Sequence, residues 1–184
     1  MSRLRADPAA STLRLWTEKE GLLSKVAHDL CLEPSEFAVR VERSGAQLES
    51  IEVELKVSAL RVQGQVKEGR VTPLSAKDHA EIERNLAGPK VLDAARHPTL
   101  TWRGSGTLAG ARIRAEGQLT LCGRSADLPL SATWEEREGS LWVSGEVRFA
   151  QTRFGVTPYK ALMGALKVKD EVRVSWELRL EEES

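Results

Sequence analysis

The chain is poor in several residue types, and each scarcity narrows what the protein can be. It has only two cysteines, Cys31 and Cys122, and no Cys-x-x-Cys pair, so we expect free thiols rather than a disulfide scaffold or a thioredoxin-like redox motif. The three histidines lack the spacing of a zinc site, and we expect neither a metal nor a cofactor. Acidic and basic residues balance at 27 each. This balance argues against a nucleic-acid partner, because phosphate binding needs a concentrated basic face.

Long apolar runs are also missing. No run approaches the ~18 residues with which a helix crosses a bilayer, so the protein is not expected to span a membrane. Residues 1–11 include Arg3 and Arg5 without an apolar stretch behind them, which is not the pattern of a secretory signal. A chain with its leader removed would look the same. We expect a cytoplasmic protein with a single domain over residues 1–184, in which residues 1–11 are flexible.

The chain does contain apolar residues at every second position, in about eight separate runs. A period of two places each set on one face of a β-strand, with polar and charged residues on the other face. The clearest sets are Ile51-Val53-Leu55-Val57, Ile113-Ala115-Gly117-Leu119-Leu121, Leu141-Val143-Gly145-Val147-Phe149 and Val172-Val174-Trp176-Leu178-Leu180. Half-wet antiparallel strands expose edges unless their sheet closes, and about eight strands close around side chains or one small ligand. The pattern therefore predicts an all-β fold, an eight-stranded antiparallel barrel with one or two short helices.

The expected strands are separated by turn signals and by one helical pattern. The strands cover residues 12–19, 37–43, 48–62, 99–108, 111–121, 127–138, 140–151 and 170–180. A helix is expected within 69–88, because Ser75 followed three residues later by Asp78 resembles a capping box. A partly helical segment is expected over 21–30, and a helical turn within 158–166.

Four stretches of the chain resemble phrases of the YceI-like family and occur in that family's order. They are residues 93–102 (DAARHPTLTW), 117–125 (GQLTLCGRS), 148–156 (RFAQTRFGV) and 168–174 (VKDEVRV). Residues 21–30 (GLLSKVAHDL) resemble the leaderless branch of the family. The resemblance extends over about residues 13–180. It implies a lipocalin-like barrel with a long apolar cavity that binds polyisoprenoid lipids.

Small residues recur halfway along the inward-facing sets, at Ala115, Gly117, Ala132 and Gly145. They would leave room inside the barrel for a hydrocarbon chain. Alternatively, the glycines permit the bends of a closing barrel, or other side chains fill the gaps. The two interpretations differ in whether the barrel is hollow.

The leading hypothesis is a barrel that carries or sequesters a long-chain isoprenoid or similar amphiphilic lipid. Aromatic and sulfur-bearing residues late in the chain would line the cavity or its mouth, although such residues often form plain core. The residues expected at the cavity and its mouth are Leu23, His28, Leu30, Trp102, Gly117, Leu119, Gly145, Phe149, Phe154, Tyr159 and Met163.

Two rival hypotheses come from other functional classes. In one, a filled barrel acts as a structural or partner-binding module, a homodimer with Trp134 and Trp142 as an exposed contact. In the other, an enzyme uses His28 with Asp29 or Cys31. Adjacent residues rarely point the same way, and no obvious nucleophile turn is present, so we expect no catalytic residues.

Overall fold

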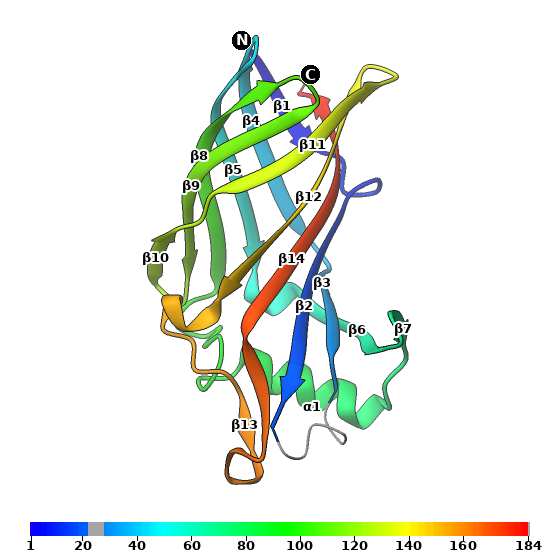
Figure 1. The fold of residues 1–184 in the computed structure, drawn as a ribbon, viewed down its shortest axis with the longest axis vertical. Helices are drawn as coiled ribbons and strands as arrows, with labels where there is room; N and C mark the ends of the chain where they lie inside the picture. Colours follow the sequence, from blue (N-terminus) through cyan, green and yellow to red (C-terminus); the bar gives the residue numbers. More distant parts are fainter. Residues whose placement is uncertain (22–27, 184) are drawn as a thin grey trace.

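Eight long antiparallel strands close into a barrel in the computed structural model, which describes residues 1–21 and 28–183 (Figure 1). Three of the eight are interrupted and consist of two strands each: β1 (Ser2–Ala6) with β2 (Thr12–Glu20), β3 (Leu30–Pro34) with β4 (Phe37–Ser44), and β5 (Gln47–Lys56) with β6 (Leu60–Lys67). The other five are β8 (Thr99–Ala109), β9 (Arg112–Leu121), β11 (Leu130–Arg137), β12 (Ser140–Ala150) and β14 (Leu166–Glu182). The long β14 closes the barrel, since one edge pairs with β12 and the other with β2 and then β1. Both chain termini lie at one end of the barrel, called here the upper end (Figure 1).

Short elements gather towards the lower end of the barrel. They are β7 (Arg70–Thr72), β10 (Arg124–Asp127), β13 (Lys160–Ala161) and the helix α1 (Ala76–Ala87). The expected capping box of the helix is confirmed, because the Ser75 hydroxyl accepts a hydrogen bond from the Asp78 N–H at 3.1 Å. Glu83 of α1 accepts a hydrogen bond from the Val62 N–H at 3.0 Å. The hydrogen bond lies outside the stretch Gln65–Lys67 that pairs with β7, and it holds α1 beside β6 at the lower end of the barrel (Figure 1).

Part of the segment 1–11, which was expected to be flexible, is a strand of the barrel. Residues Ser2–Ala6 form β1, which is hydrogen-bonded to β4 on one side and to β14 on the other. Leu4 and Ala6 point into the core, where each is at most 9% exposed. Two inward residues in a five-residue strand are too few to reveal a period of two in the sequence.

Other boundaries also differ from expectation. The strand predicted over 48–62 is interrupted by a 3-10 turn at Val57–Ala59, which separates β5 from β6. The turn expected within 158–166 is present at Leu162–Gly164, but Leu162 and Met163 in it have left-handed backbone angles, and the short β13 precedes it. Most of the segment expected to be partly helical over 21–30 lies outside the described residues, and its last residue, Leu30, begins β3.

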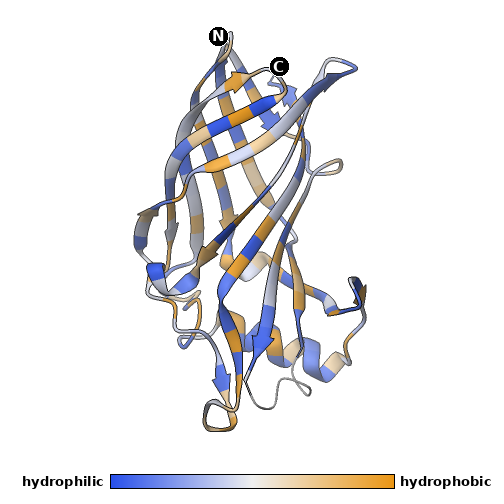
Figure 2. Ribbon diagram, in the orientation of Figure 1, coloured by the Kyte–Doolittle hydropathy of each residue, from blue (hydrophilic) through white to orange (hydrophobic). Residues whose placement is uncertain are grey.

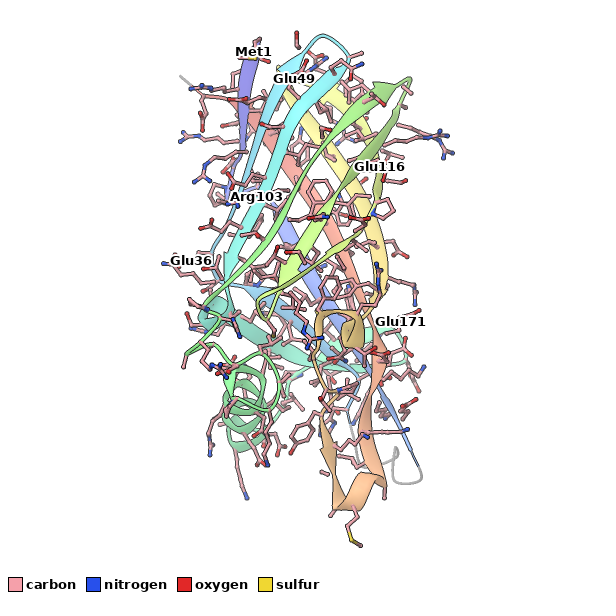
Figure 3. All side chains as sticks on the ribbon, turned by 90° about the vertical axis from the view of Figure 1, so that its left-hand side faces the viewer. Met1, Glu36, Glu49, Arg103, Glu116 and Glu171 are labelled. Carbon is pink, nitrogen blue, oxygen red and sulfur yellow. The ribbon has the colours of Figure 1, made fainter. Side chains whose placement is uncertain are left out.

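The two faces of the barrel wall have opposite character. Apolar and polar residues alternate along the strands (Figure 2), and cross-strand ion pairs cover the outside. Glu52, for example, pairs with Arg40 at 3.5 Å and with Arg103 at 2.6 Å. Arg103, Glu116 and Glu171 mark this outer face (Figure 3). Exposed pairs of this kind contribute little stability, and the apolar residues of the wall face the inside of the barrel.

Candidate functional site

An apolar cavity lies inside the barrel, with a volume of about 170 Å³. All 28 residues that line it are apolar, and every one of the eight long strands contributes at least one. The lining residues are Leu4, Leu13, Leu15, Phe37, Val39, Val41, Leu48, Ile51, Val53, Leu55, Leu100, Trp102, Leu108, Ile113, Ala115, Leu119, Leu128, Leu130, Ala132, Trp134, Leu141, Val143, Val147, Phe149, Val174, Trp176, Leu178 and Leu180.

The cavity is elongated along the barrel. On β12 its lining extends from Leu141 to Phe149, and on β14 from Val174 to Leu180. Eight residues of strand at about 3.3 Å each, tilted by roughly 40°, correspond to about 20 Å along the barrel axis. A volume of about 170 Å³ distributed over that length is narrow, which suits a chain rather than a rounded molecule.

The packed core divides into two clusters on either side of the middle of the barrel. The upper cluster includes Leu4 and Leu180, and the lower cluster includes Phe154. Ile51 and Val53 on β5 pack against both clusters but stay only partly buried, although they face inward. Their accessible surface borders the cavity. The interior is therefore not packed solid. The filled-barrel hypothesis requires an interior without such a void.

Glycines on the inner wall make room for indole rings. A Cβ atom at Gly117 would lie 2.5 Å from Cζ2 of Trp102, and one at Gly145 would lie 2.6 Å from Cζ2 of Trp176. Neither glycine lines the cavity, so their expected place in the cavity wall is wrong. The gaps that they leave are filled by tryptophan side chains, and these rings form the wall instead.

Three of the residues expected at the cavity and its mouth do line it: Trp102, Leu119 and Phe149. That they bind a ligand stays a prediction. Phe154 does not reach the cavity. It is 0% exposed and packs edge-on against Phe149, with ring centroids 5.4 Å apart, so it belongs to the core that closes the lower end. Val156, 2% exposed, lies in the same cluster.

The other expected residues lie away from the cavity. His28, Leu30 and Tyr159 are half-buried, but none of them lines it. Met163 is fully exposed at 107%, which contradicts its expected place at the mouth. Leu23 lies outside the described residues. These positions belong to loops and strand ends, where no alternation fixes the direction of a side chain.

The two tryptophans expected to form an exposed contact point in different directions. Trp134 lines the cavity, whereas Trp142 lies outside, where the Arg137 guanidinium carbon is 5.8 Å from its ring centroid. Phe37, which lines the cavity from β4, was not among the expected cavity residues. Alternation with the inward Val39 would have revealed it.

Very few polar atoms reach the interior. The Trp102 indole N–H donates a hydrogen bond to the Leu128 carbonyl at 2.9 Å. Within residues 1–21 and 28–183, the indole nitrogen of Trp134 is the only buried side-chain nitrogen or oxygen without a hydrogen-bond partner. No lining residue is charged. Such a wall can hold hydrocarbon but offers nothing to neutralise an ion.

The proposed catalytic thiol has an unsuitable environment. Cys31 is 1% exposed, and burial raises the pKa of its thiol above the ordinary value. A reactive cysteine needs the opposite shift, towards the thiolate. Among the described residues, no three His, Cys, Asp or Glu side chains come together as a metal site.

The family follows from the match of the whole barrel. A model of the YceI-like domain matches residues 5–180. The chain belongs to the YceI-like family. This YceI-like chain is similar in structure to BcnA of Burkholderia cenocepacia, with a TM-score of 0.71 and 17% identity over 95% of this chain and 98% of BcnA. It is also similar to a YCEI protein of Campylobacter jejuni, with a TM-score of 0.62 and 12% identity over 83% and 84% of the two chains. At these identities the likeness shows the shared fold. No curated protein sequence matches the chain.

Proposed function

We propose that the protein binds a long-chain isoprenoid or similar amphiphilic lipid, with the tail inside the barrel, and carries or sequesters it without chemical change. The single observation that carries this proposal is the elongated cavity with 28 apolar lining residues. Membership of a family known as polyisoprenoid-binding barrels supports it. None of the helices in the described part of the chain has the length and apolar character needed to cross a bilayer.

The cavity volume sets the length of tail that enters. One water-sized group needs roughly 10–15 Å³ by the same measure, so a cavity of about 170 Å³ holds roughly 11–17 groups of that size. Methylene and methyl groups are of similar size to water. The cavity therefore accommodates about three isoprene units, and a longer tail requires the half-buried lining residues to move apart.

The polar end of such a lipid belongs outside the cavity. An uncompensated charge in an apolar interior is strongly unfavourable, and no lining residue is charged. Binding strength then comes from the tail, at no more than ~0.8 kcal/mol for each buried methylene. Affinity should depend on tail length more than on the chemistry of the head group.

The test has two arms. In the first, protein purified from native cells without detergent is extracted with organic solvent, and mass spectrometry should return a long-chain lipid. In the second, delipidated protein is titrated with geraniol, farnesol and geranylgeraniol while the fluorescence of the cavity-lining tryptophans Trp102, Trp134 and Trp176 is followed. Affinity should rise steeply from geraniol to farnesol and less steeply beyond. Extracts that are repeatedly empty, together with no binding of any prenyl alcohol, would contradict the proposal.

A further inference from the structure

An exposed apolar tip marks the lower end of the molecule. Among the described residues, the large apolar side chains that are exposed are Met1, Val71, Leu162 and Met163. Leu162 and Met163 are neighbours, 62% and 107% exposed, at the turn of the hairpin formed by β13 and β14. This hairpin extends beyond the rest of the barrel at the end opposite the termini (Figure 1).

The backbone conformation of the tip directs both side chains outward. Leu162 and Met163 have φ values of 51° and 55°, in the left-handed region, which L-residues with side chains rarely adopt. The turn is closed by a hydrogen bond from the Ala165 N–H to the Leu162 carbonyl at 3.1 Å. The end of β2 supports it closely, because a Cβ atom at Gly21 would lie 2.6 Å from the Ala165 carbonyl oxygen.

The hairpin itself carries only basic side chains, and β2 balances part of their charge. Residues 157–169 contain three lysines and no acidic residue. Lys167 and Lys169 form ion pairs with Glu20 and Glu18 of β2, and Lys160 is exposed next to the tip. The two exposed apolar side chains beside the ammonium group of Lys160 suit an anionic bilayer surface, where the apolar groups enter the interface and the ammonium group remains among the lipid head groups.

We infer that the tip Leu162–Met163 inserts into the surface of an anionic lipid bilayer. This inference rests on the proposed function, because a barrel that carries a membrane-soluble lipid must take it up or release it at a membrane. Insertion would remove two large apolar side chains from water without unfolding any part of the barrel. It would also explain why the chain presents these residues outward in a conformation that is unfavourable for their side chains.

Vesicle flotation tests the inference directly. The wild-type protein should float with vesicles of phosphatidylcholine and phosphatidylglycerol, and less with phosphatidylcholine alone. The double variant Leu162→Ser/Met163→Ser should bind the mixed vesicles at least about tenfold more weakly. Val71→Ser is the matched control, since Val71 is also exposed, at 42%, but belongs to β7. This control should bind like the wild type.

Several outcomes would overturn the inference. These are a wild-type protein that does not float, a double variant that floats equally well, or an equal loss in Val71→Ser. A double variant that changes only self-association in gel filtration would show instead that the tip contacts a second copy of the chain. Titration with farnesol in the absence of vesicles separates this inference from the proposed function. The double variant should bind farnesol as the wild type does. A wild-type protein that floats with vesicles but does not bind farnesol would count against the cavity and not against the tip.

Discussion

Filling the cavity should stabilise the barrel and abolish lipid binding. Val53 on β5 and Val147 on β12 both line the cavity and are half-buried. Their strands are four apart in the ring of eight and lie on opposite walls. The double change Val53→Phe/Val147→Phe would add eight carbon atoms to the hollow. At ~0.8 kcal/mol for each buried carbon, complete burial would contribute roughly 6 kcal/mol.

The cavity itself limits this gain. An unfilled volume of about 170 Å³ lowers the free energy of unfolding by about 4 kcal/mol, at ~24 cal/mol per Å³. Because two rings will not fit without some misfit, we expect a net gain of about 2 kcal/mol in the free energy of unfolding. Urea unfolding of delipidated protein measures it, since bound lipid would add its own stabilisation.

The sign of the change distinguishes a hollow barrel from a filled one. In a packed interior each enlargement would destabilise by ~1–3 kcal/mol. Loss of stability at an unchanged m-value, or farnesol binding equal to that of the wild type, would refute the reasoning. Val71→Phe, outside the barrel, is the control and should change neither property.

Three further predictions follow from the interior. Gly117→Ala should destabilise the protein by about 1–3 kcal/mol and weaken farnesol binding, because the new Cβ would lie 2.5 Å from both the Arg103 carbonyl oxygen and the Trp102 ring and would displace that ring from the wall. Unchanged urea unfolding would contradict this. Trp102→Phe should cost about 1–3 kcal/mol more than Trp134→Phe, because only Trp102 leaves a buried carbonyl without its donor; equal losses in thermal or urea unfolding would be inconsistent with this hydrogen-bond assignment. Burial raises the pKa of the Cys31 thiol above the ordinary 9.0, so this thiol should react slowly with iodoacetamide in the folded protein. The free energy of unfolding should fall as the pH rises above about 9, because the thiol ionises first in the unfolded chain. The variant Cys31→Ala should show a smaller fall over the same pH range.

The sequence predicts the wall of the barrel well, because a period of two leaves no freedom in which side chains face inward. Val143 and Val147 on β12 and Trp176 on β14 line the cavity as their alternation requires. On β5 the alternation of inward and outward side chains is interrupted. A bulge relative to β8 between Leu48 and Ile51 brings both residues to the inside although their spacing is odd, and such a bulge has no local signal.

What fills the middle of the barrel could not be read from the sequence. The close approach of Trp102 to Gly117 depends on the register of β8 against β9, and register is a property of paired strands. Phe154 and Met163 lie in turns, where no period separates a buried residue from an exposed one. The structure places the first at 0% exposure and the second at 107%.

The most direct test of the account is a high-resolution crystal structure of protein purified from native cells without detergent. The account predicts continuous, elongated density for a hydrocarbon chain inside the barrel, between Leu141 and Leu180 at the upper end and Trp102 and Phe149 at the lower end. An interior whose side chains meet at the barrel axis and leave no void would contradict it.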